Sequence, residues 1–387
     1  MLEIGAILHT QCVSPEEALS GDHACHRSES TISSRHSGQR LINFCSNDYL
    51  DLARHPHVLD AAKQAVDTFG AGATSSRLVS GTLTLHERLE NRLAAYKHTP
   101  AALVFGSGYL ANLGAVTALA GHRDTVFADR LIHASLIDAV KLSGAALKRF
   151  RHNDPGHLDE LLKRSPDNGR RLVITESVFS MDGDIAPLDD ISETARRHGA
   201  LFMVDEAHSC GISHPTRSLA ARPDIIMGTL SKGFGSYGGF IACSTAMRDW
   251  LINKARSFIY TTALPPACLG AALGALDVLK DNPGMGDQLL HNARGFRDRL
   301  RRGGLDTAGS ATQIIPVMIG DNHTTLALAA TLRQRNIYCV AIRPPTVPEG
   351  TARLRVSVSL GHSVSDLDIA ADAMIAAVRP LDMHSQK

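Results

Sequence analysis

The stretch Leu201-Phe-Met-Val-Asp-Glu-Ala-His208 decides the fold, because a short apolar run ends there in an acid and a histidine follows three residues later. Such a run is typical of a buried strand. Similar runs occupy 101–105, 125–128, 172–175, 225–229 and 239–243, and helical periodicity fills 83–96, 110–120, 187–198 and 246–255. This alternation predicts an α/β fold with a largely parallel sheet covered by helices on both faces. Sheets of this type bind ligands at the carboxyl ends of their strands.

The pattern changes after about residue 265. Long helical stretches at 266–280 and 287–302 precede a strand, a helix, two strands and a helix through 314–378. We therefore expect a large domain over 43–265 and a smaller α+β domain over 266–387. Residues 1–42 form an amino-terminal arm, whose Ser, His and Cys residues show no sustained period. They indicate a loosely structured segment with room for one short helix.

Composition excludes several classes of protein. The chain has 387 residues, more than one ordinary core supports, with 44% hydrophobic residues, 20% charged residues and a net charge of +1. This balance gives no reason to expect a nucleic-acid or membrane partner, and no apolar run reaches the ~18 residues of a membrane span. The seven cysteines are scattered without a CxxC pair, which predicts reduced thiols, a cytoplasmic location and no metal site.

The segment Thr229-Leu-Ser-Lys-Gly-Phe-Gly235 offers the sharpest chemistry. A lysine at a strand end, among small hydroxyl residues and glycines, can bring its amine against a planar phosphorylated aldehyde. Thr229 and Ser231 would then offer donors to the phosphate. Taken alone, Lys232 could equally be a solvated lysine in a glycine-rich loop.

Asp205 ends the apolar run of the opening stretch, where a buried charge is costly unless it is paired. A pyridinium nitrogen would be a suitable partner, because the ion pair keeps the ring protonated and able to accept electrons. The alternative is that Asp205 caps the following helix, although a cap would not account for His208.

Three more polar segments follow predicted strands. Gly106-Ser-Gly-Tyr-Leu-Ala-Asn112 could bind a phosphate through the first N–H groups of a helix, and His133 could lie flat on a cofactor ring. Ser180 could donate to the phenolic oxygen of the ring. The alternatives are that 106–112 is an ordinary glycine turn, that His133 is a structural histidine and that Ser180 belongs to a polar loop. Because all five segments follow predicted parallel strands, we expect them to converge on one edge of the sheet, around pyridoxal 5'-phosphate.

In their residues and their order, these motifs resemble those of the α-oxoamine synthase family, whose members are pyridoxal-phosphate enzymes of fold type I. The resemblance runs from about residue 43 to the end of the chain. The motifs that carry it are Ser46-Asn-Asp-Tyr-Leu50, His133-Ala-Ser, Phe179-Ser-Met-Asp-Gly-Asp184, Val204-Asp-Glu-Ala-His208, Ser231-Lys-Gly-Phe-Gly235 and Arg343-Pro-Pro-Thr-Val-Pro348.

The resemblance implies a role for each candidate. Lys232 would hold the cofactor as a Schiff base and take the α-proton, Asp205 would pair with the pyridinium and His133 would stack on the ring. The other cofactor contacts would be His208 and Ser180 at the ring oxygen, and Gly108, Tyr109, Thr229 and Ser231 at the phosphate. The segment that contains Thr262 would reach the phosphate of a neighbouring subunit, which implies a homodimer with a shared active site.

Two arginines could bind the substrate carboxylate, because a planar guanidinium forms two parallel hydrogen bonds with it. The resemblance favours Arg355 for this role, with Arg343 and Asn47 assisting. Arg353 is expected to be a structural surface charge.

The resemblance also implies a reaction, the decarboxylative condensation of L-alanine with a pimeloyl thioester of coenzyme A or acyl carrier protein, as in biotin synthesis. Glycine with acetyl-CoA, glycine with succinyl-CoA and serine with a long acyl thioester are alternatives within the family. A regulator that keeps the fold without turnover is a third class. It is disfavoured because about forty residues are too few for an added DNA-binding domain.

Overall fold

The structure is a computed structural model that describes residues 33–36, 39–165, 169–216, 219–220 and 222–382. Most of the expected arm, residues 1–32, therefore lies outside the described residues. The end of the arm is not loosely structured. Strands β1 (Ser33–His36) and β2 (Gln39–Asn43) pair antiparallel there, and β2 pairs in parallel with β11 (Ile337–Tyr338), far along the chain.

The predicted α/β fold is confirmed by a seven-stranded sheet in the order β3-β9-β8-β7-β6-β4-β5. Its strands are β3 (Ala101–Phe105), β4 (Thr125–Asp129), β5 (Ala146–Phe150), β6 (Arg171–Glu176), β7 (Leu201–Asp205), β8 (Ile225–Thr229) and β9 (Gly239–Cys243). Strand β9 runs antiparallel to both neighbours, and the other six run in one direction. The polar segments that follow β3, β4, β6, β7 and β8 therefore leave the sheet at the same edge.

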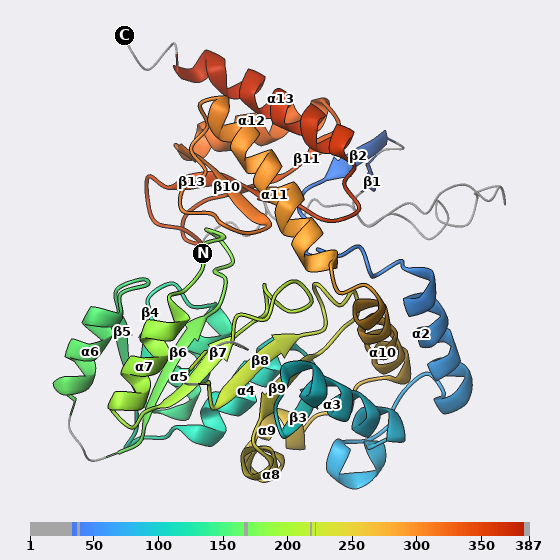
Figure 1. The fold of residues 1–387 in the computed structure, drawn as a ribbon, viewed down its shortest axis with the longest axis vertical. Helices are drawn as coiled ribbons and strands as arrows, with labels where there is room; N and C mark the ends of the chain where they lie inside the picture. The colour runs from blue at the N-terminus through green and yellow to red at the C-terminus, as the bar shows by residue number, and fades with distance from the viewer. Residues whose placement is uncertain (1–32, 37–38, 166–168, 217–218, 221, 383–387) are drawn as a thin grey trace, which may run out of the picture.

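Helices cover both faces of this sheet (Figure 1). Side chains alternate along each strand, so that Val126 and Ala128 pack against one face while Phe127 packs against the other. The first face is covered by α4 (Gly108–Leu119), α5 (Ala134–Ser143), α8 (Thr245–Lys254) and α9 (Arg256–Ile259). The second is covered by α6 (Pro155–Lys163), α7 (Leu188–Arg197) and α3 (Thr84–Lys97).

The carboxyl-terminal part contains a smaller antiparallel sheet in the order β10-β13-β12, with α12 and α13 lying beyond it in Figure 1. Its elements are α11 (Met285–Arg302), β10 (Ile314–Gly320), α12 (Asn322–Gln334), β12 (Val340–Ile342), β13 (Ala352–Ser357) and α13 (Val364–Asp382). Helix α10 (Pro266–Asp281) packs instead against α2 (Pro56–Phe69) and α3. The domain boundary at residue 265 stays a prediction. Among the described helices, none combines the length and the apolar composition that a bilayer crossing needs.

Close backbone approaches fix the loop between β8 and β9. Gly239 lies so near the amino end of α4 that a Cβ would come within 2.6 Å of the Gly108 nitrogen. Gly235 has a φ of +60°, and a Cβ there would meet the Ala53 nitrogen at 2.3 Å. Only glycine fits these positions, and the loop that carries Lys232 is thereby held against the beginning of α4.

Candidate active site

A cavity of about 190 Å³ lies at the carboxyl edge of the large sheet. It is lined by Gly108, Tyr109, Asn112, His133, Ser135, Glu176, Asp205, Ala207, His208, Met227, Thr229 and Lys232. Seven of the sequence-predicted residues are in this set: Gly108, Tyr109, His133, Asp205, His208, Thr229 and Lys232. The structure thus brings predicted residues from four of the five segments to one cavity, and their roles stay a prediction.

Lys232 and His208 are in direct contact, with 2.8 Å between Lys232 Nζ and His208 Nε2. Burial lowers the pKa of Lys232, and the Arg355 charge lowers it further, while Asp205 and Glu176 oppose the change. Burial also lowers the pKa of His208 well below its usual range, with Lys232 and Arg355 acting in the same direction. The arrangement favours a neutral imidazole and a reactive amine.

Asp205 has its carboxylate fixed by two donors. Asn112 Nδ2 donates to one oxygen at 2.9 Å, and the main-chain N–H of Ala207 donates to the other at 2.9 Å. Burial raises the pKa of Asp205, and these two hydrogen bonds oppose that rise. The acid is therefore not a simple helix cap, because both its oxygens are held at the wall of the cavity.

Glu176 was not expected in the site. It pairs with Asp205 across β6 and β7, it is buried, and its Oε1 accepts a hydrogen bond of 2.5 Å from the main-chain N–H of His133. Burial raises the pKa of Glu176 well above its usual value, and the neighbouring Asp205 raises it further. An acid that directly follows a buried strand was the sequence signal, as it was for Asp205.

The other end of the cavity suits a phosphate. Ser107 caps α4 by accepting a hydrogen bond from the Leu110 N–H at 3.1 Å, and Gly108 and Tyr109 at the start of that helix line the cavity. The Thr229 hydroxyl donates to the Gly238 carbonyl at 3.0 Å. The predicted residue Ser231 does not line the cavity, since its hydroxyl closes the lysine loop on the same carbonyl at 3.2 Å.

Arg355 and Asn47, which are predicted to bind the substrate carboxylate, are in contact with each other outside the lining of the smaller cavity. Arg355 donates from Nε to the Ser180 carbonyl at 2.7 Å and from Nη1 to the Ser357 hydroxyl at 2.9 Å. Both its Nη atoms lie 3.3 Å from Asn47 Oδ1. Arg343 directly follows β12 and is half-buried, but it lines neither this cavity nor the larger one described next.

A second cavity, of about 790 Å³, adjoins the first. Ile132 lines the larger cavity and the next residue, His133, lines the smaller. The larger cavity is lined by Arg130, Leu131, Ile132, Arg149, His152, Phe179, Ser180, Met181, Asp182, Pro345, Thr346, Val347, Pro348, Thr351 and Arg353. Ser180 thus lies in the neighbouring cavity. Thr262 lies apart from both, where it bridges to Ser76.

The expectation that Arg353 lies at the surface was wrong. This arginine is 4% exposed and forms an ion pair with Asp182. Residues 353 and 355 are two apart in one strand and therefore point to the same side. Arg353 joins the carboxyl-terminal sheet to the loop that follows β6.

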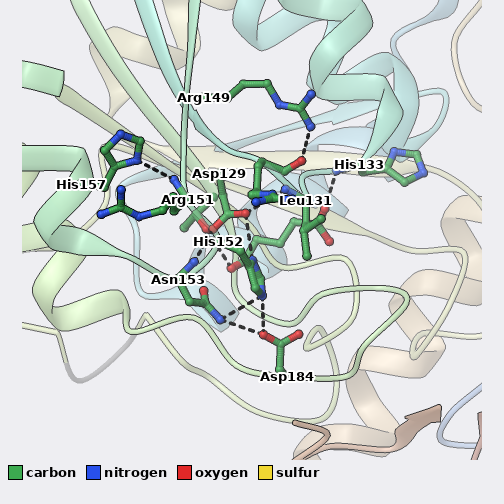
Figure 2. A network of polar contacts seen from close by, with 12 residues as sticks. Asp129, Leu131, His133, Arg149, Arg151, His152, Asn153, His157 and Asp184 are labelled. Atoms are coloured by element: carbon green, nitrogen blue, oxygen red, sulfur yellow. Dashed lines mark hydrogen bonds and ion pairs between the residues drawn. The ribbon is translucent and has the colours of Figure 1, made fainter. Parts of the chain in front are cut away.

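His152, at the wall of the larger cavity, lies between two aspartates (Figure 2). Its Nδ1 lies 2.9 Å from Asp129 Oδ1, and its Nε2 lies 2.7 Å from Asp184 Oδ2. Burial opposes the charged form, but both carboxylates outweigh it and raise the pKa of His152 to about 9. Asp129 also accepts hydrogen bonds from the Leu131 and Asn153 main chains, so the network shapes the turn that leads to His133.

We expect His152 to make stability depend on pH. A histidine whose pKa rises on folding stabilises the fold fully below its unfolded pKa of about 6.5, and the contribution disappears as the pH rises through about 9. The wild type should lose about 1–3 kcal/mol of unfolding free energy over this interval. Thermal melting of His152→Gln should lack that loss. His157→Gln, which alters a histidine that accepts a hydrogen bond from the Arg151 main chain, should keep it. Equal pH dependence in all three proteins would contradict this assignment.

The donor set of the smaller cavity fits pyridoxal phosphate. It combines a half-buried amine, a carboxylate held by two donors, an imidazole and the amino end of a helix, which are the groups required for an aldehyde, a pyridinium, an aromatic ring and a phosphate. Within the described residues, no group of three or more His, Cys, Asp or Glu side chains could hold a metal ion.

Comparison with known proteins agrees with this geometry. The family of class I and II aminotransferases matches residues 39–374. An 8-amino-7-oxononanoate synthase of Citrifermentans bemidjiense is 47% identical over 343 residues, which are 86% of this chain and 88% of that protein. A solved structure of SPT (serine palmitoyltransferase) with PLP (pyridoxal phosphate) has a TM-score of 0.88 at 32% identity, and the match covers 93% of this chain and 92% of that one. The 8-amino-7-oxononanoate synthase of Francisella tularensis has a TM-score of 0.74 at 28% identity, covering 87% and 97%. The chain belongs to the class I and II aminotransferase family and, within it, to the α-oxoamine synthases.

Proposed function

We propose that this enzyme condenses L-alanine with a pimeloyl thioester, releasing carbon dioxide and a free thiol and giving 8-amino-7-oxononanoate for biotin synthesis. The observation that carries the proposal is the single cavity in which Lys232, Asp205, His133 and His208 meet, in a chain 47% identical to a relative named for this activity.

Pyridoxal phosphate, when bound, supplies an electron-accepting ring that stabilises negative charge at the α-carbon of the amino acid. Lys232 Nζ would bind the cofactor aldehyde and later take the α-proton, for which its lowered pKa is suitable. Asp205 would hold the proton on the ring nitrogen. His133 would cover the ring and donate a hydrogen bond to the thioester carbonyl as charge develops on it.

The remaining predicted residues would orient the two ligands. Gly108, Tyr109 and Thr229, which line the cavity, would hold the phosphate, and Ser231 would support them by closing the lysine loop. His208 would contact the ring oxygen, and Ser180 would approach it from the neighbouring cavity. Arg355 would bind the alanine carboxylate, with Asn47 and Arg343 assisting. Burial of the Arg355 guanidinium supports this role, because its ion pair would be little screened by water.

The larger cavity would receive the acyl thioester. Arg130 and Arg149 stand at the ends of β4 and β5, three and four strands from β8, or about 14–19 Å at ordinary strand spacing. A pimeloyl chain extends only about 7 Å, whereas the arm from the thioester to the carrier phosphate extends about 16 Å. The two arginines would therefore meet the phosphate that coenzyme A and acyl carrier protein both carry.

A homodimer with a shared active site, in the cytoplasm, belongs to the same proposal. Leu78 and Val79 of helix η2 (Arg77–Gly81) are 52% and 79% exposed, and Tyr260, close to Thr262, is 71% exposed. The bridge between Ser76 and Thr262 brings these apolar side chains together. An exposed cluster of this kind supports a protein interface beside the residue that would reach the partner's phosphate.

Serine palmitoyltransferase activity is the second candidate, because SPT has the higher TM-score, 0.88 against 0.74. The sequence favours the first candidate, since the identity to SPT is 32% and that to the Citrifermentans protein is 47%. Backbone similarity reports the shared fold, whereas substrate choice depends on individual side chains.

A panel of substrates tests this choice. Alanine, glycine and serine are each supplied with pimeloyl-, acetyl-, succinyl- and palmitoyl-CoA, and thiol release is measured. We expect alanine with pimeloyl-CoA to give a kcat/KM at least about tenfold above every other pair, because pocket contacts of 1–3 kcal/mol separate such substrates. Faster reaction of serine with palmitoyl-CoA would favour the second candidate and overturn the first.

A further inference from the structure

A chain of hydrogen bonds joins Asp205 to His133 along the wall of the smaller cavity. Asn112 Nδ2 lies 2.9 Å from Asp205 Oδ2 and 3.0 Å from Ser135 Oγ. The Ser135 hydroxyl lies 2.8 Å from His133 Nδ1, and the Ser135 main-chain N–H donates to the same nitrogen at 3.2 Å. Asn112 and Ser135 are each 1% exposed. The chain connects the predicted partner of the pyridinium with the predicted donor to the thioester.

The charge of Asp205 fixes the direction of the chain. A carboxylate only accepts hydrogen bonds, so the Asn112 atom that faces it is the amide nitrogen, which has two hydrogens. The reverse orientation of the amide would set two acceptors against each other. The second amide hydrogen goes to Ser135 Oγ, which is therefore an acceptor toward Asn112. The hydrogen of the Ser135 hydroxyl is left for His133 Nδ1.

Two donors at one ring nitrogen decide where His133 carries its hydrogen. The hydroxyl and the main-chain N–H of Ser135 both face Nδ1, and a hydrogen on Nδ1 would oppose the hydrogen of the main-chain N–H. Desolvation lowers the pKa of His133 and the Lys232 charge lowers it further, while Asp205 opposes the change. A neutral imidazole is favoured, and its single hydrogen then lies on Nε2.

The place of this hydrogen matters for the reaction with the thioester. The His133 side chain is exposed to the cavity, and among the described residues its Nε2 has no hydrogen-bond partner. A hydrogen on Nε2 is therefore available to a ligand, and it can donate to a carbonyl oxygen on which negative charge develops. The other tautomer would present a lone pair to that oxygen and repel it.

We propose that Ser135, oriented by Asn112, is a positioning residue that holds His133 with its hydrogen on Nε2, where it donates to the acyl carbonyl. The inference rests on the proposed function, in which His133 makes this hydrogen bond to the thioester. Ser135 acts through the imidazole, so it serves the condensation with the thioester and not the earlier removal of the α-proton.

The test separates these two stages. Thiol release from L-alanine and pimeloyl-CoA reports the whole reaction. Exchange of the alanine α-proton in D2O without any thioester, followed by proton NMR on the holoenzyme, reports the first stage alone. We expect Ser135→Ala to lower kcat/KM for the thioester about threefold to tenfold, which is the range for the loss of one hydrogen bond. The exchange rate should stay within about twofold of the wild type.

Ser143→Ala is the matched control. Ser143 is the last residue of the same helix, α5, where its hydroxyl donates to the Val140 carbonyl at 2.8 Å, and it does not line the cavity. Both rates should equal those of the wild type. A second comparison introduces Ser135→Ala into His133→Phe, which keeps an aromatic ring but has no ring nitrogen. Because the hydroxyl acts through the imidazole, Ser135→Ala should change kcat/KM less than about twofold in this background.

A further measurement locates the hydrogen itself. The holoenzyme is labelled with 15N-histidine, and the His133 signals are identified as those lost in His133→Phe. A two-dimensional 1H–15N spectrum should find the hydrogen on Nε2, because this experiment distinguishes the two ring nitrogens. A hydrogen on Nδ1 in the wild type would overturn the inference whatever the activities of the variants.

The kinetic results can overturn the inference separately from the proposed function. A wild-type kcat/KM in Ser135→Ala would remove the role of this residue and leave the proposed function intact. A fall of the exchange rate as large as that of thiol release, or an equal fall in Ser143→Ala, would show a general structural effect and have the same consequence. Absence of thiol release by the wild type with every pair of the substrate panel would overturn the proposed function, and the role of Ser135 would fall with it.

Discussion

Lys232→Ala should lower thiol release by at least about a thousandfold, because the change removes both the amine that would bind the cofactor aldehyde and the base that would take the α-proton. Within the described residues, Lys232 is the lysine that lines the smaller cavity. Lys97, which is buried, forms an ion pair with Glu206 and does not line the cavity. Borohydride reduction of the wild-type holoenzyme, followed by peptide mass mapping, should place the cofactor on Lys232.

Lys63→Ala is the control for this prediction. Lys63 is exposed on α2, and its ion pair within the described residues is with Asp60, so its loss should leave turnover and the reduced peptide unchanged. The assignment would be wrong if Lys232→Ala kept more than about a tenth of the wild-type rate. A reduced cofactor attached to another lysine would contradict it equally.

The sheet was predictable where strands are buried on both faces. Strand β8 at Ile225–Thr229 is buried throughout and begins with three large apolar residues, and it was located from its sequence alone. Strand β5 was missed because it is an edge strand in which Lys148 and Arg149 interrupt the apolar pattern. Nothing in the residues of β9 distinguishes an antiparallel strand from a parallel one, since its direction depends on the short loop after β8.

The site was predictable where a polar side chain directly follows an apolar strand. Asp205 met that criterion, since it ends β7, and His133 follows β4 by four residues; the structure brings both to the cavity. Glu176 met it as well, but the hydroxyl-rich residues after it drew attention to Ser180. Tyr49, whose hydroxyl lies 2.7 Å from His208 Nδ1, could not have been found in this way. Its contact with His208 joins residues 159 positions apart, and such a contact depends on how the segment after β2 packs on the large sheet.

Arg353 shows a different limit of sequence reasoning. An arginine in a strand is usually exposed, and a single sequence gives no direct sign that β13 is buried on both faces. The strand lies between β10 and β12, and Asp182 from another part of the chain supplies the opposite charge. The spacing between Arg353 and Arg355 did indicate that the two side chains lie together, because residues two apart in a strand point to the same side.

Asp205→Asn should lower turnover about a hundredfold to a thousandfold, whereas Glu176→Gln should stay within about threefold of the wild type. The two carboxylates are paired in register on β6 and β7, and burial raises the pKa of both. Two buried carboxylates side by side do not both ionise readily. Asp205 has two donors that favour its anion, while Glu176 has the main chain of His133 alone among its hydrogen bonds in the described structure. We therefore assign the charge to Asp205 and the proton to Glu176.

The isosteric pair of variants makes this assignment measurable. Glutamine has the shape of a protonated glutamate, and its carbonyl can still accept the hydrogen bond from His133, so the wall of the cavity should be preserved. Asparagine at 205 keeps the shape as well but loses the negative charge that a pyridinium requires. Thiol release and the cofactor absorbance of both variants should be compared at neutral pH. If turnover by Glu176→Gln fell as far as turnover by Asp205→Asn, the negative charge would reside on Glu176 or be shared by the two carboxylates. Because each change alters one charge and hardly any volume, the difference between them isolates which carboxylate is the anion in the working enzyme.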